Sequence, residues 1–393
     1  MTSQSAIEPH TPSPVLLWFR RHSSAILGWA IVAVSFCVSY ASFVRYQVFF
    51  TPDSRYYLAM AFLFGGDSPE LARERTIDFA ANYGVEVPEL DLLFGWGLVQ
   101  PRVVLPTLAA PLVRLIGPFG LAATTLLITI ALIITTTLIL SRRFGWLTAT
   151  ATMLLVNGSF YLMSYFGSML TESLSALWTA LALVAGWRWI QSRNPWWLVM
   201  AGGVTVASAF TRQATLIVAG AFLMAWLLGS LVERRNSSWM WPAIVVTVAS
   251  LGSQLVQTLV FPSFSQLNQF YRATGTDNLL DALLAVPGLA YRIVVSDFFL
   301  LLKYDRVLIF LILLALAGIV LFIRRAESHL LIGAILATAL YNITNGTPTQ
   351  FRYATPGIIF FIVLAACVIH RTGRSISARA SAIAPLTDRS ASE

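Results

Sequence analysis

Long apolar stretches separated by short polar connections make up most of the chain. The first of them, Ala25–Phe43, contains no charged residue. An α-helix crosses the hydrocarbon core of a bilayer in about 20 residues, because lipid offers no partner for an unpaired backbone group. A transmembrane β-barrel would instead show alternating segments of about ten residues. The pattern therefore predicts an all-α fold, a polytopic bundle of transmembrane helices.

Arginine pairs order these stretches across the membrane. Arg142 and Arg143 follow one apolar stretch and Arg324 and Arg325 follow another, and basic residues concentrate in cytoplasmic connections. Keeping every such pair on one side predicts about ten spans with both termini in the cytoplasm. The predicted spans are Ala25–Phe43, Phe119–Leu140, Trp146–Tyr165, Leu174–Ile190, Trp196–Ala209, Ala214–Leu231, Trp241–Phe261, Val307–Ile323, Leu330–Tyr341 and Pro356–Ile369.

The same assignment predicts the connections. Two long loops, at about residues 45–117 and 262–306, are expected on the outer face. The second half of the first loop is apolar but rich in proline, which disfavours a straight spanning helix and indicates juxtamembrane or re-entrant helices. The transmembrane bundle covers residues 25–371, and the flanking residues 1–24 and 372–393 are expected to be disordered cytoplasmic tails.

Composition supports a membrane location. Hydrophobic residues make up 57% of the chain and charged residues only 11%, whereas soluble domains carry about 25% charged residues. The net charge is +8, the basic residues are almost all arginines, and many of them sit in pairs at the ends of apolar stretches. This distribution favours the cytoplasmic-loop explanation over nucleic-acid binding. We therefore expect a multi-pass protein of the inner or plasma membrane with no nucleic-acid partner.

Four polar positions collect at the predicted outer ends of the spans. They are Asp53, Glu172, Arg212 and Arg352, and each belongs to a different outer connection. A carboxylate within hydrogen-bond reach of an acceptor hydroxyl can take its proton, and arginines can clamp a phosphate and stabilise its developing charge. If the helices pack into one bundle and these residues meet, the combination is typical of group transfer from a lipid phosphate.

Each of these residues also has a simpler explanation. Asp53 can cap a helix that begins at Ser54, and Glu172 can be a cap or a solvated side chain. Arg212 and Arg352 can extend to lipid phosphates at the membrane interface. The sequence leaves these alternatives open.

The remaining outer acids give weaker signals. Asp277, Asp281 and Asp297 are expected to be solvated. Glu89 and Asp91 form a short acidic string that could hold a divalent cation, but such a string in an acidic loop is weak evidence for a site. No metal or other cofactor is therefore predicted.

Five short motifs carry a resemblance to a known family. They are Pro52-Asp53-Ser54-Arg55-Tyr56-Tyr57, Arg102-Val103-Val104-Leu105-Pro106, Thr171-Glu172, Thr211-Arg212 and Arg352-Tyr353. With these motifs the chain resembles the GT-C superfamily of polytopic glycosyltransferases, which use polyprenyl-phosphate-linked sugars, such as protein O-mannosyltransferases and the aminoarabinose transferase. As architecture, the resemblance covers most of residues 25–370. The chain departs from the family at Ser54, where relatives usually carry Glu, and at Glu172, where their second acid is typically Asp.

The resemblance implies an active site on the outer face, with Asp53 as catalytic base and inversion at the sugar carbon. It implies a donor such as a decaprenyl or undecaprenyl phosphosugar, whose phosphate Arg212 and Arg352 would hold, while Glu172 would orient the acceptor or support the base. The acceptor is left open among glycan, lipid and protein. The further predicted substrate-binding residues are Arg55, Tyr56, Tyr57, Arg102 and Tyr353.

Two other functions fit the same charges. A transporter or flippase for a lipid-linked sugar would use them to line a path, although many transporters show internal repeats and helices broken at mid-membrane, and no repeat is apparent. A non-catalytic assembly subunit would leave Asp53 as a helix cap. The favoured hypothesis is an inverting hexosyl- or pentosyltransferase of the cell envelope, and convergence of the four polar sites would distinguish it from a subunit without a site.

Overall fold

The computed structural model describes residues 14–234, 237–261, 265–346 and 348–387. Every regular element in these ranges is helical, which confirms the predicted all-α fold. The elements are α1 Pro14–Tyr46, α2 Ser54–Phe64, α3 Pro69–Ala81, α4 Leu90–Gly95, α5 Val104–Ile116, α6 Phe119–Phe144, α7 Trp146–Gly158, α8 Phe160–Gly167, α9 Glu172–Ser192, α10 Trp196–Ala209, α11 Thr215–Glu233, α12 Met240–Val260, α13 Gln266–Thr274, α14 Leu279–Tyr304, α15 Arg306–Leu321, α16 Ala326–Asn345, the 3-10 helix η1 Arg352–Gly357, and α17 Ile358–Thr387.

Within the described part of the chain, seven helices are long and apolar enough to cross a membrane. They are α1 from His22, α6, α11, α12, α14, α16, and η1 together with α17 up to Ser375. An eighth is added if α8 and α9, which meet at a bend of 100°, count as one span. The helices α5, α10 and α15 are apolar but shorter. The chain thus has the character of a multi-pass membrane protein, while the count of about ten spans stays a prediction.

One candidate span lies where the sequence predicts an outer loop. The interval 262–306 contains α14, a helix of 26 residues with the length and composition of a membrane span. Charged residues along it, such as Arg292 and Asp297, interrupt the apolar pattern and conceal it. Asp281 in its first turn and Lys303 in its last turn complement the helix dipole. The expected loop therefore contains a long apolar helix, while its place on the outer face stays a prediction; residues 262–264 lie outside the described part.

The predicted tails are also partly helical. Residues 14–24 belong to α1 and residues 372–387 to α17, which corrects the expectation of disorder there. Pro14 suits the first position of a helix, and the alanine- and serine-rich segment after Gly373 extends a helix that has already formed, which costs less than nucleating a new one. Residues 1–13 and 388–393 lie outside the described part.

The third predicted span, Trp146–Tyr165, is interrupted between α7 and α8. At the break, the Ser159 hydroxyl donates to Asp305 Oδ2 at 2.6 Å and the backbone N–H of Tyr161 donates to the same oxygen at 2.8 Å. Asp305 Oδ1 accepts the N–H of Leu308 at 2.9 Å and so caps α15. A single buried carboxylate therefore joins the start of α8 to the start of α15.

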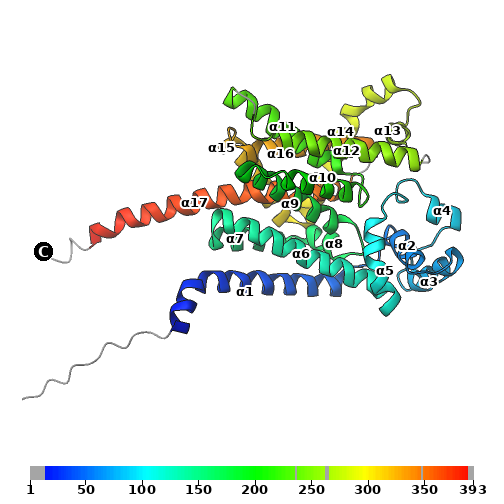
Figure 1. Ribbon diagram of the computed structural model, residues 1–393, viewed down its shortest axis with the longest axis horizontal. Coiled ribbons are helices and arrows are strands. Elements are labelled where there is room, and N and C mark those ends of the chain that lie inside the picture. Colours follow the sequence, from blue (N-terminus) through cyan, green and yellow to red (C-terminus); the bar gives the residue numbers. More distant parts are fainter. Residues whose placement is uncertain (1–13, 235–236, 262–264, 347, 388–393) are drawn as a thin grey trace, which may run out of the picture.

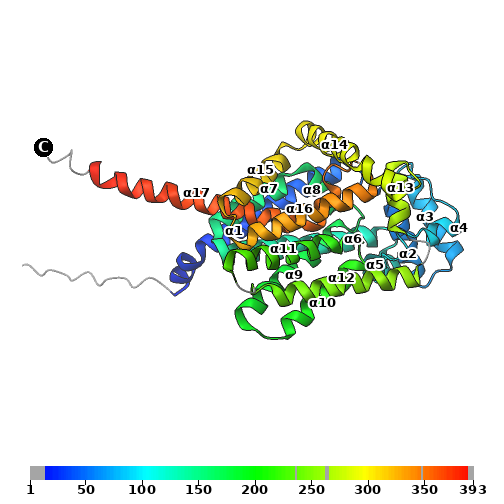
Figure 2. The ribbon, with the colours of Figure 1, turned by 90° about the horizontal axis from the view of Figure 1, so that it is seen from above.

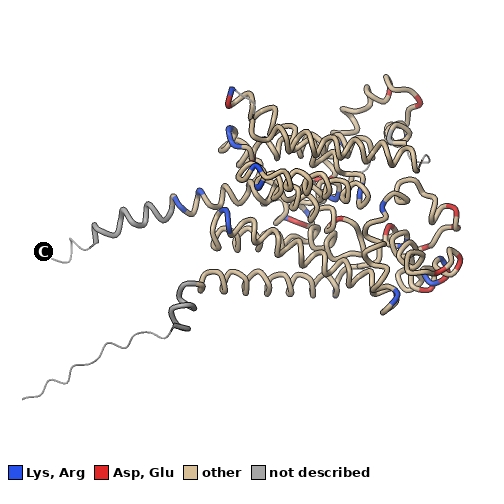
Figure 3. Tube along the Cα trace, in the orientation of Figure 1, with Lys and Arg blue, Asp and Glu red and all other residues tan. Residues whose placement is uncertain are grey.

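The helices run mostly side by side and give the bundle two distinct ends (Figures 1 and 2). The beginning of α1 and the emerging part of α17 lie at one end, here named the terminal end. The helices α2, α3, α4 and α13 gather at the opposite end, here named the distal end. Acidic residues concentrate around α2–α4, whereas basic residues mark several connections at the terminal end (Figure 3).

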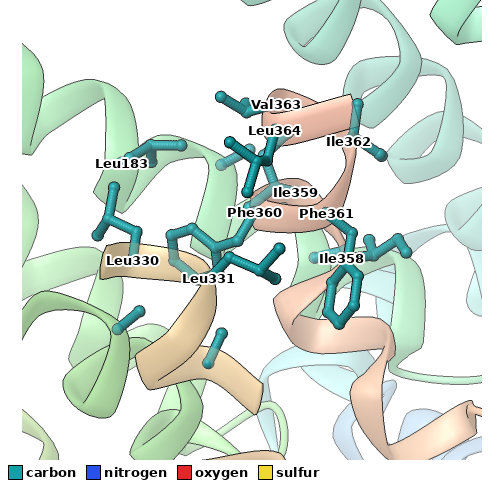
Figure 4. Packing of buried hydrophobic residues seen from close by; sticks show 14 of the residues in the cluster. Leu183, Leu330, Leu331, Ile358, Ile359, Phe360, Phe361, Ile362, Val363 and Leu364 are labelled. Atoms are coloured by element: carbon teal, nitrogen blue, oxygen red, sulfur yellow. The ribbon is translucent and has the colours of Figure 1, made fainter. Parts of the chain in front are cut away.

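The centre of the bundle is formed by the start of α17. Its residues from Ile358 to Leu364 are all at most 4% exposed. Figure 4 shows these turns beside Leu183 of α9 and Leu330 and Leu331 of α16. A helix that is apolar on every side is one that neighbours surround completely. Because η1 leads directly into this buried segment, the position of Arg352 is fixed by the core.

The most extensive contact between two helices is the one between α11 and α16. A Cβ atom added at Gly333 of α16 would lie 2.1 Å from the backbone oxygen of Gly220 and 2.7 Å from Ala221 Cα of α11. Small residues of this kind let membrane helices approach until their backbones touch. Arg212 lies just before α11 and Arg352 just after α16, so this contact brings both arginines to one region.

We expect the Gly333→Leu substitution to destabilise the protein, because its side chain has only backbone atoms to displace. The expected cost is about 1–3 kcal/mol or more, as for other overpacked interiors, measured by thermal unfolding in detergent. The matched control is Gly252→Leu on the exposed side of α12, where an added Cβ meets nothing within 4 Å. Equal unfolding temperatures for the two variants would contradict the backbone contact.

Candidate functional site

Asp53 lies immediately before α2 but does not cap it. Its side chain makes no capping hydrogen bond, and the nearby Ser54 hydroxyl instead accepts the N–H of Thr51 at 3.0 Å. Asp53 Oδ2 accepts a hydrogen bond of 2.7 Å from Arg352 Nη2, and 30% of the Asp53 side chain is exposed. The capping explanation does not hold, because the carboxylate points to a distant arginine and remains accessible.

Glu172 is the first residue of α9 and its side chain is completely buried. Its Oε1 accepts hydrogen bonds from Arg212 Nη1, at 2.6 Å, and from Arg352 Nε. The amino end of a helix favours a negative charge, so both the helix and the two guanidinium groups stabilise the carboxylate. Glu172 is therefore neither a cap nor a solvated side chain.

Arg212 occupies the turn between α10 and α11, and only 1% of its side chain is exposed. The Gln257 amide donates to the carbonyl of Ala209 at 2.9 Å, and the N–H of Val104 donates to the carbonyl of Phe210 at 3.2 Å, so α12 and α5 both hold this turn. Burial alone would lower the pKa of Arg212, but Glu172 outweighs it and the pKa is raised. The guanidinium thus stays charged inside the protein, out of reach of lipid phosphates.

Arg352 joins the two carboxylates. It begins η1, donates to Asp53 and to Glu172, and has 24% of its side chain exposed. The residues before it, Gln350 and Phe351, have φ angles of 48° and 72°, a left-handed conformation that costs about 1–3 kcal/mol per residue unless the surroundings impose it. The direction of Arg352 therefore depends on what holds this turn.

Two residues that the sequence did not single out for the site hold the turn. Asp297 of α14 accepts the backbone N–H groups of Thr349 and Gln350 at 2.9 and 2.8 Å. From the other side, the Tyr165 hydroxyl lies 3.0 Å from the carbonyl oxygen of Thr349. Asp297 therefore binds the backbone of this turn, and the expectation that it is solvated is wrong. The sequence did contain one signal for this role of Asp297, because a carboxylate within an apolar helix is energetically unfavourable unless it has a partner.

The predicted substrate-binding residues near α2 are mostly buried. Tyr56 is 3% exposed and packs against Trp96 with ring centroids 4.8 Å apart. Tyr57 is fully buried, and its hydroxyl accepts from Arg102 Nη1 at 2.8 Å. The Arg55 guanidinium lies 4.9 Å from the centre of the Tyr56 ring. These contacts fasten α2 to the first loop, so they support the position of Asp53 rather than offer a free surface.

Tyr353 lies on the inner side of the same cluster. Its ring is 5.4 Å from the Arg212 guanidinium and 5.0 Å from the centre of the Tyr341 ring. Arg102, which is 8% exposed, is close enough to interact electrostatically with Asp53 and with Arg212. Arg102 and Tyr353 therefore extend the site whose centre is formed by Asp53, Glu172, Arg212 and Arg352.

The site carries an excess of positive charge. Three arginines, Arg102, Arg212 and Arg352, face the two carboxylates of Asp53 and Glu172. Several buried polar atoms have no hydrogen-bond partner among the described residues, and those at the site are Arg102 Nε, Thr171 Oγ1, Glu172 Oε2, Ser173 Oγ, Arg212 Nε and Gln213 Nε2. Uncompensated buried charge is costly, so this arrangement is suited to an anion.

The acidic string in the first loop does not form a cluster. Glu89 is exposed and accepts a hydrogen bond of 3.2 Å from Arg73. In the described part of the chain, no three or more His, Cys, Asp or Glu side chains gather as a metal site would require. The candidate site is therefore built from carboxylate and guanidinium groups.

The two carboxylates should differ in their effect on stability. Replacing Glu172 by Ala leaves Arg212 buried without a counter-charge, which we expect to lower the free energy of unfolding by about 3–5 kcal/mol. Replacing the more exposed Asp53 by Asn should cost about 1 kcal/mol or less. Thermal unfolding of both variants in the same detergent tests the difference, and equal losses would show that the Glu172–Arg212 pair is not the structural centre.

No protein-family model, curated protein or solved structure matches this chain. The function is therefore inferred from the side chains and their geometry.

Proposed function

We propose that the protein is an integral membrane glycosyltransferase that moves a sugar from a polyprenyl-phosphate donor to an acceptor on the outer face of the membrane. The observation that carries this proposal is the convergence of Asp53, Glu172, Arg212 and Arg352 from four separate segments. A positively charged cluster with one accessible carboxylate meets the two needs of the reaction, which are an anion-binding group and a proton acceptor.

The four side chains differ in solvent exposure, and this difference suggests different roles for them. Asp53 and Arg352 are partly exposed, whereas Glu172 and Arg212 are sealed. Arg352 is therefore the group that meets the donor phosphate, and its planar guanidinium can bind phosphate with two parallel hydrogen bonds. The burial of Arg212 does not suit the contact with donor phosphate expected from the sequence. Arg212 and Glu172 are instead positioning residues that hold Arg352.

In the proposed reaction, Asp53 accepts the proton of the acceptor hydroxyl. The hydroxyl oxygen forms a bond to the anomeric carbon of the sugar, while the bond from that carbon to the phosphate oxygen breaks. Polyprenyl phosphate leaves with the electron pair of that bond, and attack from the opposite side inverts the anomeric configuration. Arg352 stabilises the charge that develops on the leaving phosphate.

A cavity next to the Arg352 turn suits the lipid part of the donor. It has a volume of about 290 Å³ and lies among α14, α15, α16 and the start of α17. Its wall is apolar apart from Asp297, Thr338 and Asn342, and it includes Phe351, the residue just before Arg352. An apolar chain in this cavity would place its phosphate beside the arginine.

Replacing Asp53 by Asn should reduce sugar transfer by about 10²–10⁴-fold, because the amide cannot accept the proton. The assay reconstitutes the full-length protein in liposomes with a panel of polyprenyl-phosphate sugars and measures release of polyprenyl phosphate. The matched control is Asp78→Asn, an exposed acid on α3 in the same loop. Retained activity in Asp53→Asn would contradict the proposal. Movement of the intact lipid-linked sugar across the bilayer without release would indicate a transporter instead.

Replacing Arg352 by Ala should weaken donor binding more than acceptor binding. Loss of a charged hydrogen bond to phosphate is expected to raise the donor KM by about tenfold or more, with little change in the acceptor KM. Arg352→Lys keeps the charge but not the paired geometry and should recover part of the affinity. If Arg352→Ala raised both KM values equally, the residue would have a general structural role.

A further inference from the structure

A second group of arginines lies at the terminal end of the bundle, away from Asp53. It surrounds a cavity of about 570 Å³ between the ends of α6 and α15 and the middle of α17. Figure 3 shows basic residues at the α15–α16 connection and along α17 where it leaves the bundle. The arginines that line the cavity are Arg324, Arg325, Arg371 and Arg374.

An aromatic ring organises two of these guanidinium groups. Arg325 lies 4.9 Å and Arg371 lies 5.6 Å from the centre of the Phe322 ring. Phe322 is 9% exposed and lines the same cavity. Both cations therefore lie against one ring although both residues are exposed, and an anion bound beside them would reduce the repulsion between the two charges.

The four arginines have no carboxylate partner among the residues that the structure describes. Arg143, at the end of α6, differs from these four arginines because it has a carboxylate partner. It pairs with Glu327 in the first turn of α16 and lies 4.3 Å from the Trp187 ring. Glu327 is thus already neutralised by another arginine. The cavity is left with four positive charges and no negative side chain in its wall.

We propose that this cavity binds a phosphoryl group. Arginines arranged around a concave surface recognise phosphate through paired hydrogen bonds. The wall also contains Phe144, Leu321 and Ile323, which suits a ligand with an apolar portion next to its phosphate. Basic pockets between membrane helices bind the headgroups of anionic lipids, and a free phosphate compound offers the same anionic chemistry. The site is distinct from the proposed transferase site and does not depend on it.

The test uses the full-length protein, stripped of lipid in a neutral detergent. Phosphatidylglycerol, phosphatidylcholine, glycerol 3-phosphate and inorganic phosphate are titrated separately, and binding is followed by thermal unfolding and by native mass spectrometry. We expect phosphatidylglycerol to bind and phosphatidylcholine not to bind. The double variant Arg325→Gln, Arg371→Gln should bind at least about tenfold more weakly, because it loses two charged contacts.

The matched control is the double variant Arg45→Gln, Arg114→Gln, which removes the same charge from exposed positions near the distal end. Arg45 also lies over an aromatic ring, at 5.3 Å from the centre of Tyr46. The control should bind like the wild type. If the first double variant does not fold, Arg374→Gln at the rim of the cavity should still weaken binding several-fold.

Each outcome decides the proposal. Binding of phosphatidylglycerol alone, lost in the cavity variants, assigns the site to a lipid headgroup. Equal binding of glycerol 3-phosphate or inorganic phosphate, lost in the same variants, assigns it to a free phosphate group. Absence of binding, or equal losses in the cavity and control variants, would overturn the proposal, because the arginines would then act only through their general charge.

Discussion

The fully buried carboxylate of Glu172 is the interaction on which the arrangement of the candidate site depends. It holds the guanidinium groups of Arg212 and Arg352, and through Arg352 it reaches Asp53. Charges in a region of low dielectric interact strongly, and removing one partner leaves the other unpaired at a high cost. The start of α2, the start of α9, the α10–α11 turn and η1 are consequently fixed relative to one another.

The site combines a sealed half with an open half. Glu172 and Arg212 are removed from solvent, whereas Asp53 and Arg352 are partly exposed. Preorganised charges are most effective when their supporting groups cannot rearrange. The sealed pair supplies this rigidity and the open pair supplies access. The left-handed turn before Arg352 is only partly buried, but it is held in place because Asp297 and Tyr165 bind its backbone from two sides.

The four site residues could be predicted from the sequence because a charged residue beside an apolar stretch is energetically costly. Asp53, Glu172, Arg212 and Arg352 stand out because each is charged at the end of an apolar stretch, and the structure brings them together. Their individual exposure was not predictable, since burial of Arg212 depends on α5 and α12 packing over its turn.

The features that the sequence did not predict correctly have related causes. Asp297 acts on the backbone of a loop more than fifty residues away in the chain, which no local pattern reveals. The charges on α14 made a long apolar helix look like a loop, and the two tails looked disordered although α1 and α17 continue into them. In each case a tertiary contact or a neighbouring helix outweighed the local pattern.

The close contact between Gly220 and Gly333 also has a mechanical consequence. Because the backbones of α11 and α16 touch, these helices cannot slide or separate without losing their contact surface, and they behave as one rigid body. Arg212 directly precedes α11, and the turn that leads to Arg352 follows α16, so the α11–α16 contact limits how far the two arginines can move apart. Asp53 lies outside this contact, at the start of α2.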